Sequence, residues 1–325
     1  MLAFTIRRFL QSVIVIFVMS LIVFLGIYAI GNPVDILINP EADLAEQEAT
    51  IRRLGLDKPI WTQYFTFLTN ALQGDLGVSF VHNEPALRII MERLPATMEL
   101  AVGAVGLAIL IGIPAGMIAG LNPESIVGRG IMAGSILGFS LPTFWVGLML
   151  IMLFSVMLGW LPASGRGDTV EFLGIQVSFL TWDGLTHIFL PAFNLALFKM
   201  SLVIRLSRAG TREVMLQDYI KFARAKGLSD VRVIGVHVLK NILIPVVTVL
   251  GLELGSVIAF AVVTETVFAW PGIGKLLIDS IGNLDRPLVV AYLLLTVTMF
   301  IIINFVVDIL YSLLDPRVRL GDMKS

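Results

Sequence analysis

The sequence predicts an all-α integral membrane protein with six transmembrane helices. Its mean hydropathy is +0.91, and 57% of its 325 residues are hydrophobic against 14% that are charged. This balance is far from that of a soluble domain. The apolar residues are also concentrated into runs that reach the roughly 20 residues an α-helix needs to cross a bilayer.

The first run, Phe9 to Ile30, contains no charged residue and follows Arg7 and Arg8. A secretory signal peptide is the alternative, because Ala29-Ile30-Gly31 offers a small-x-small cleavage site. The apolar core of such a peptide usually has roughly 7–15 residues, fewer than this run contains. We therefore expect an uncleaved first transmembrane helix over residues 1–30, with a basic N-terminus.

The five remaining predicted spans are residues 97–121, 130–158, 187–207, 243–268 and 288–312. Six spans place both termini on one side of the membrane. That side carries fourteen Lys and Arg residues and the other side carries eight, five of them in one long loop. The positive-inside rule then predicts cytoplasmic termini for a multi-pass membrane protein.

The external segment 31–95 is predicted to be ordered and helical. A first helix covers 41–54 and a third, short helix runs from Asn83 to the residue before Pro95. The second helix starts at Pro59 and ends before Gly74. Its apolar stripe consists of Ile60, Trp61, Tyr64, Phe65, Leu68 and Leu72. The segment is either a lid on the outer surface of the bundle or a direct contact for substrate or partner.

Small residues recur at four-residue spacing in three spans, which indicates closely packed helix faces. These residues are Gly112, Gly116 and Gly120, then Gly130, Gly134 and Gly138, then Gly251, Gly255 and Ala259. Helix packing explains them, and a gate that slides on glycine faces is the alternative. Pro114, Pro142 and Pro191 lie inside spans and are predicted to bend them.

The charged loop 208–242 separates the fourth and fifth spans. A helix is predicted from Asp218 to Lys226, with an amphipathic face formed by Tyr219, Phe222, Ala223 and Lys226. Gly227 is suited to end that helix, because glycine tolerates the left-handed conformation. Ser229 or Asp230 can cap a following helix. The small Ala223 would let the surface of another protein approach, although basic helical loops are common in bacterial membrane proteins.

The block Asp218-Tyr219-Ile220-Lys221-Phe222-Ala223-Arg224-Ala225-Lys226-Gly227-Leu228-Ser229 resembles the coupling-loop motif of ABC-importer permeases of the dipeptide/oligopeptide/nickel family. Where the wider superfamily has Glu-Ala-Ala, this chain has Lys221, Phe222 and Ala223, as is usual in the peptide branch. Further stretches resemble the family in order along the chain. They are Leu54–Pro59, Gly74–Ser79, Arg93–Leu100, Leu158–Gly165, Glu265–Gly274 and Leu314–Arg319. The chain is thus similar to the "B" type permease subunit.

This resemblance implies the type I ABC importer permease fold, with an ordered external loop after the first helix. A five-helix core would cover 96–320, with the coupling loop 208–242 inside it and a tail at 321–325. The implied partners are a homologous "C" type permease, two ATPase subunits, an external solute-binding protein and the lipid bilayer. The residues expected to couple to the ATPase are Asp218, Tyr219, Phe222, Ala223, Arg224, Lys226, Gly227 and Leu228.

An enzyme is not expected. The chain has no cysteine, and its three histidines are far apart in sequence. Gly274-Lys275 lacks the remaining P-loop residues, because Ala269 and Leu276 stand where glycine and Ser or Thr are required. No catalytic, metal or cofactor site is predicted, and no nucleic-acid partner. ATP and magnesium would belong to the partner ATPase subunits.

An ion-coupled secondary transporter is the rival class, because Lys199 and Glu253 lie within predicted spans. Lys199 is about 9 Å by helix rise from Arg205, and Glu253 about 12 Å from Pro245, at the same end of consecutive spans. We hypothesise an ion pair between them. The alternatives are a solute contact in the pore, separate snorkelling, or contacts with a partner subunit. In the family the Glu253 position is more often Gln.

Asp308 is interpreted as an interfacial charge and not as a proton carrier. Six spans without an evident internal repeat suit half of a pore, and an ATPase-docking loop has no role in an ion-coupled carrier. The importer interpretation is therefore preferred. The resemblance favours a di- or oligopeptide substrate, with nickel or another small solute as the alternative.

Overall fold

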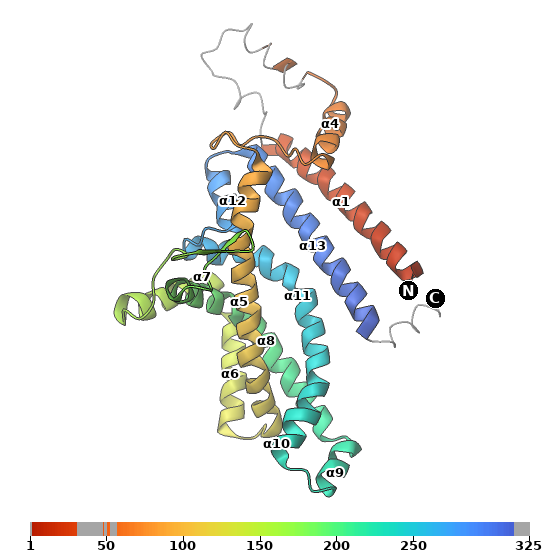
Figure 1. The fold of residues 1–325 in the computed structure, drawn as a ribbon, viewed down its shortest axis with the longest axis vertical. Coiled ribbons are helices and arrows are strands. Elements are labelled where there is room, and N and C mark those ends of the chain that lie inside the picture. Colours follow the sequence, from red (N-terminus) through yellow and green to blue (C-terminus); the bar gives the residue numbers. More distant parts are fainter. Residues whose placement is uncertain (1, 31–47, 49–50, 53–56, 315–325) are drawn as a thin grey trace. The chain divides into compact units, whose positions relative to one another are not determined.

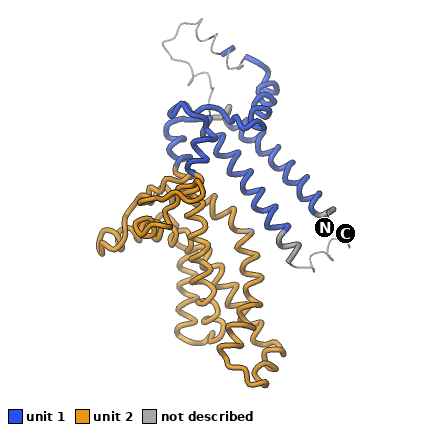
Figure 2. Tube along the Cα trace, viewed as in Figure 1, with its two compact units in different colours: residues 1–93, 276–325 blue, residues 94–275 orange. Residues whose placement is uncertain are grey.

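The computed structural model describes residues 2–30, 48, 51–52 and 57–314 (Figure 1). The chain forms two compact units, coloured separately in Figure 2. Unit 1 combines residues 1–93 with residues 276–325, and unit 2 consists of residues 94–275. The N-terminal span therefore belongs with the C-terminal span, whereas the sequence divides the chain into consecutive segments.

Five helices among the described residues are long and apolar enough to cross a membrane. Their spans are Thr5–Gly26, Ala86–Leu121, Trp182–Met215, Asp230–Gly251 and Arg286–Ile309. A sixth arises if Ile126–Ser140 and Thr143–Met157, which meet at a bend of 110°, form one broken span. The predicted α-helical fold with six spans is confirmed in this form.

In unit 1, α1 (Leu2–Ile30) packs along α13 (Arg286–Leu314). The Phe9 and Phe305 rings meet edge to face, with centroids 6.4 Å apart. Arg8 forms an ion pair of 3.3 Å with Asp308. Asp308 is therefore neutralised by the basic N-terminal end of the first span, as suits an interfacial charge.

The three helices predicted in the external segment have different outcomes. The first, over 41–54, falls largely outside the described residues. The second is confirmed as α4 (Ile60–Leu72), which follows Pro59. The third is wrong as a separate helix, because α5 (Ala86–Leu121) starts there and continues through Pro95 and Pro114 into the second span.

The start of α5 differs from the predicted cap at Asn83. Asn83 has a φ of 53° and lies in a turn before the helix. The carbonyl of Pro85 accepts the first helical N–H groups, from Arg88 and Ile89. The turn itself is held by the buried Asp285, which accepts hydrogen bonds from the Ser79 hydroxyl and from nearby backbone N–H groups. Asn83, whose N–H bonds to the Ser79 carbonyl, thus belongs to this turn and is not a helix cap.

In unit 2, α8 (Trp182–Met215) packs against α6 (Ile126–Ser140) and α11 (Leu239–Val267). The glycines of α5 also face α8, where the two backbones approach closely. A Cβ atom added at Gly116 would lie 2.5 Å from the carbonyl oxygen of Ile204. Gly112 and Gly120 meet α8 in the same way. This glycine set is therefore a packing face.

The third predicted span is not one continuous helix. It consists of α6, α7 (Thr143–Leu150) and the π-helical η1 (Ile151–Met157). The prediction that Pro142 bends the span understates the change, because Leu141 and Pro142 are both extended and the two halves meet at 110°. Proline lacks an N–H and disfavours helical geometry in the preceding residue. Pro191, in contrast, remains inside α8.

Two small elements were not part of the sequence prediction. A two-stranded antiparallel hairpin, β1 (Val170–Phe172) and β2 (Ile175–Val177), pairs Val170 with Val177. A short helix, α12 (Ile273–Gly282), follows α11. The loop between the fourth and fifth spans contains α9 (Asp218–Ala225), α10 (Asp230–Arg232) and the π-helical η2 (Val233–Val238).

Candidate functional site

The short helix α9 lies where α8 ends and the chain returns through α10 and η2 into α11 (Figure 1). Its start is set by the Gln217 carbonyl, which accepts the N–H of Ile220. Its end is set by Gly227, whose φ of +78° is in the left-handed region. The Gly227 N–H bonds to the Arg224 carbonyl and the Leu228 N–H to the Ala223 carbonyl. The predicted helix and its glycine stop are therefore confirmed.

The two faces of α9 have different surroundings. Ile220 and Ala223 are buried, and α9 contacts η2 on this side. Tyr219 and Phe222 are exposed, with 43% and 61% of their surfaces accessible. The expectation that Ala223 leaves room for a partner is wrong, because Ala223 is at the edge of the stripe and faces this chain.

Charged side chains form one ion pair within α9 and one between α9 and α10. Lys221 bonds to Asp218 at 2.9 Å, and Arg224 pairs with Asp230 at 3.2 Å. The hydrogen bond from Lys221 lowers the pKa of the Asp218 carboxyl. Asp218 therefore stays negative at the N-terminal end of α9, where the helix dipole favours an anion. The ammonium of Lys226 lies 4.6 Å from the centre of the exposed Phe222 ring.

The structure also brings together Lys199 of α8 and Glu253 of α11. The Lys199 ammonium donates to Glu253 Oε2 and, at 2.7 Å, to the Ser256 hydroxyl. The Lys199 side chain is 5% exposed and that of Glu253 is 36% exposed. The pair thus joins the two helices that enter and leave the loop of α9, and its acidic member borders the surface of the chain.

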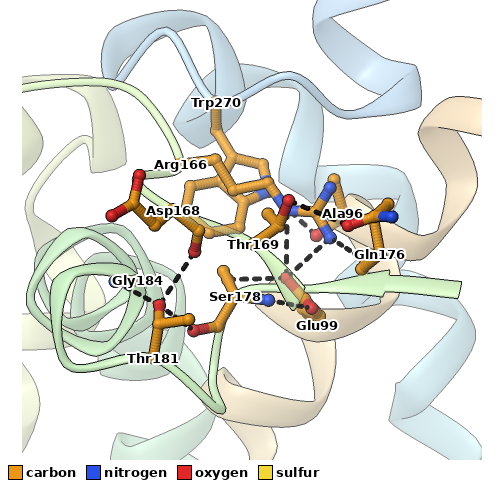
Figure 3. Close-up of polar contacts among 10 residues, drawn as sticks. All are labelled: Ala96, Glu99, Arg166, Asp168, Thr169, Gln176, Ser178, Thr181, Gly184 and Trp270. Carbon is orange, nitrogen blue, oxygen red and sulfur yellow. Dashed lines mark hydrogen bonds and ion pairs between the residues drawn. The ribbon is translucent and has the colours of Figure 1, made fainter. Parts of the chain in front are cut away.

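A second polar cluster fixes the hairpin segment to α5, as Figure 3 shows. The buried carboxylate of Glu99 lies 3.1 Å from the Arg166 guanidinium. It also accepts hydrogen bonds of 2.8 Å from the N–H and the hydroxyl of Ser178. Arg166 in turn donates to the Gln176 carbonyl at 2.6 Å. One carboxylate therefore holds both sides of the hairpin.

A third cluster, partly visible in Figure 3, connects α5 to the segment after α11. The Trp270 indole N–H donates to the Ala96 carbonyl at 2.8 Å. Glu265 is fully buried and accepts from the Thr97 hydroxyl and from the N–H groups of Gly274 and Lys275. The stretches 93–100 and 265–274 are each recognisable in the sequence, but the contact between them is not. The signal was a polar residue in each stretch at the end of an apolar span.

These features define a class of protein: a multi-pass α-helical membrane protein with a short exposed helix between its fourth and fifth spans. Residues 112–320 match the family described as binding-protein-dependent transport system inner membrane component. Residues 1–101 match the corresponding N-terminal family of these membrane components. The chain belongs to this family of inner-membrane transport permeases.

Several relatives are similar over nearly the whole chain. The di/tripeptide transport system permease protein DppB of Pseudomonas aeruginosa (strain UCBPP-PA14) is 42% identical, covering 98% of this chain and 99% of that protein. The dipeptide permease DppB of Escherichia coli (strain K12) is 39% identical, with coverage of 98% and 99%. The oligopeptide permease AppB of Bacillus subtilis (strain 168) is also 39% identical, with coverage of 98% and 100%.

The fold has a counterpart among solved structures. The MetNI methionine ABC transporter, in an inward-facing form, contains a chain that matches with a TM-score of 0.54 and 16% identity. The match covers 70% of this chain and 97% of that chain. The predicted type I ABC importer permease fold and the assignment as a transport permease are confirmed. The ion-coupled carrier is not the class found.

Proposed function

We propose that this chain forms half of the translocation pore of an ATP-driven importer and receives the force of ATP hydrolysis through α9. It would pair with a homologous second permease, bind two ATPase subunits at the cytoplasmic face and accept solute from an external binding protein. ATP and magnesium would be held by the ATPase subunits. Closure of the ATPases would move α9 and switch the paired permeases between inward-facing and outward-facing states.

The observation that carries this proposal is the exposed apolar surface of α9 and its neighbours. Tyr219 and Phe222 are exposed on α9, and Leu216 and Val231 beside it are 75% and 83% exposed. Exposed aromatic and aliphatic side chains grouped in a charged loop are typical of a protein contact. The opposite face of α9 is anchored through Ile220 and Ala223. A force applied to the outer face would therefore be transmitted to this chain.

The transmission path runs through the helices on either side of α9. The carbonyl of Ala223 accepts the N–H of Leu228, and Arg224 pairs with Asp230, so α9 and α10 would move together. Further inside, the Lys199–Glu253 pair ties α8 to α11. A displacement of α9 would thus move α8 and α11 together instead of separating them.

The substrate that we propose is a di- or oligopeptide. The support is the similarity to permeases named for di/tripeptides, dipeptides and oligopeptides over nearly the full chain. A further relative, 37% identical, is named as a glutathione permease, and glutathione is itself a small peptide. Nickel or another small solute remains the alternative substrate within the same transporter class.

The decisive experiment purifies the tagged chain, co-expressed with its transport partners, in mild detergent. We expect a second permease and ATPase subunits to co-purify and to hydrolyse ATP. Phe222→Ala should reduce the amount of bound ATPase, because it removes an exposed aromatic contact. Lys221→Ala, on the neighbouring charged surface of the same helix, is the matched control and should retain most of it.

Gly227→Pro tests the transmission itself. Proline fixes φ near −65° and lacks an N–H, so it excludes the +78° conformation and the bond to Arg224. We expect the complex to lose transport and the stimulation of ATPase activity by loaded binding protein. Transport by an ATPase-free protein, or full activity in both Phe222→Ala and Gly227→Pro, would overturn the proposal.

A further inference from the structure

The helix α4 packs on a part of α1 that lies within the apolar span. The buried Tyr64 hydroxyl is 2.8 Å from the Ser20 hydroxyl. The Tyr64 ring also contacts Phe17 and Phe24 of α1, with centroids 6.1 Å and 5.3 Å away. Phe24 in addition contacts Phe67, one turn further along α4. Figure 1 shows α4 beside the end of α1 that is away from the N-terminus.

The depth of α4 follows from these contacts. The apolar span of α1 covers Thr5–Gly26. At a rise of 1.5 Å per residue, Phe24, Ser20 and Phe17 lie about 3, 9 and 14 Å inside its C-terminal end. A hydrocarbon core is roughly 30 Å thick. Tyr64 therefore reaches residues in one leaflet of the bilayer, which is the outer leaflet if the N-terminus is cytoplasmic.

The face of α4 next to Tyr64 presents apolar side chains that the described part of the chain leaves open. Trp61, Phe65 and Leu72 are exposed, and their spacing of four and seven residues places them on one stripe. A shallow groove runs over this surface, lined by Trp61, Thr62, Phe65, Thr66 and Thr69. No acidic or basic residue occurs anywhere from Ile60 to Leu72.

Two of the three threonine hydroxyls in this groove, those of Thr66 and Thr69, are satisfied within the helix. The Thr66 hydroxyl donates to the Thr62 carbonyl at 2.9 Å. The Thr69 hydroxyl donates to the Phe65 and Thr66 carbonyls at 3.0 and 2.8 Å. Hydrocarbon offers no hydrogen-bond partner, so a helix that borders it must satisfy its polar groups internally. The charged Asp57, Lys58 and Asp75 occur just beyond the two ends of α4.

We propose that α4 is embedded in the leaflet at the C-terminal end of α1, with its Trp61–Phe65–Leu72 stripe covered by lipid acyl chains. The aromatic side chains would lie at the boundary between headgroups and hydrocarbon, where tryptophan is favoured. The apolar surface would continue that of α1, whose Ile14 and Ile22 are exposed. The start of the external segment would thus be a membrane anchor and not a lid over the pore.

The absence of cysteine from this chain permits a direct test, because an introduced cysteine is the only one in the chain; the unsubstituted complex, treated with the same reagent, gives the background from its partners. Nitroxide labels would be attached at Trp61→Cys and Phe65→Cys in the assembled complex. The complex would be placed in nanodiscs of phosphatidylethanolamine and phosphatidylglycerol. Collision rates with oxygen, which concentrates in lipid, and with a water-soluble nickel chelate would be compared. Ile14→Cys on α1 is the lipid reference, and His82→Cys, in the turn before α5, is the aqueous reference.

We expect labels at both α4 positions to show oxygen-to-nickel collision ratios close to that of Ile14→Cys and several-fold above that of His82→Cys. A ratio equal to that of His82→Cys would place α4 in water and overturn the proposal. Low collision rates with both reagents would show that a protein covers the stripe, which also overturns it. Two label positions keep the test intact if one variant does not fold. The result is independent of whether α9 binds an ATPase.

Discussion

At the residue scale, three buried carboxylates organise backbone that lies outside the transmembrane helices. Glu99 accepts the N–H of Ser178, Glu265 those of Gly274 and Lys275, and Asp285 those of Phe80 and Val81. Buried backbone donors must be paired, and a carboxylate can accept several at once. From sequence each acid looks like an ordinary charge at the end of a span. The partners of Glu99 and Asp285 are distant in the chain, so only folding identifies them.

The Lys199–Glu253 pair is the residue-scale feature with the sharpest energetic consequence. Lys199 is almost enclosed, so its charge depends on Glu253 and Ser256 for compensation. The position of the pair could be predicted, because equal depth on antiparallel helices follows from helix rise alone. The hydroxyl of Ser256 could not, since serine in a span more often bonds only to its own backbone.

We expect Glu253→Gln to destabilise the protein, because it leaves the Lys199 ammonium without a counter-charge. Breaking a fully buried pair costs about 3–5 kcal/mol. The cost here should be smaller, since Glu253 is over one-third exposed. The double variant Lys199→Met with Glu253→Gln should recover most of the loss. Thermal unfolding in detergent and transport measure both effects.

Lys240→Met, at an exposed lysine close to the start of α11, is the control for removing a positive charge. It should leave the unfolding temperature almost unchanged. If the double variant unfolds no later than the less stable of the two single variants, the two side chains do not stabilise each other.

At the scale of elements, proline shows how far sequence reasoning extends. Pro95 and Pro142 both follow leucine, yet α5 continues through the first and the third span breaks at the second. After Pro95, Ala96 and Thr97 are held by Trp270 and Ile273. After Pro142, α7 packs against α8 and α11 in a new direction. Local propensity is the same in the two cases, and tertiary contacts decide the outcome.

The glycine faces of α5 and α6 have the same residue spacing but different tertiary surroundings. A Cβ at Gly116 would collide with Ile204, whereas no described atom lies within 4 Å of a Cβ at Gly130. Gly116→Ala should therefore lower the unfolding temperature markedly, as overpacking typically costs about 1–3 kcal/mol. Gly130→Ala should be neutral or slightly stabilising in the isolated chain, because alanine favours helix by about 1 kcal/mol.

Thermal unfolding of the two purified variants in the same detergent makes the comparison. Equal unfolding temperatures would contradict the close approach of α5 and α8. A Gly130→Ala chain that is stable alone but no longer assembles with its partners would identify the α6 face as a contact with another subunit.

At the scale of the whole molecule, the span count, the helical class and the loop with α9 followed from hydropathy and charge. The pairing of α1 with α13 did not, because apolar helices carry no sequence mark of which neighbour they choose. The hairpin of β1 and β2 was also missed, since three-residue strands are too short for a periodic pattern.

Membrane orientation gives a prediction at this scale. In spheroplasts, an impermeant maleimide should label Glu171→Cys in the exposed hairpin without disruption of the membrane. Lys221→Cys on α9 should react only after permeabilisation. The side of the membrane that holds α9 carries fourteen Lys and Arg residues, which predicts that it is the cytoplasmic side. The reverse pattern would place α9 outside the cell and remove it from any contact with a cytoplasmic ATPase.

The break between α6 and α7 has a consequence for hydration. In a continuous helix the carbonyl of Gly138 would accept the N–H of residue 142, which is a proline and has none. An unpaired polar group in hydrocarbon costs roughly 2–7 kcal/mol. We therefore expect water or another polypeptide, and not lipid alone, to border this corner of the chain in the membrane.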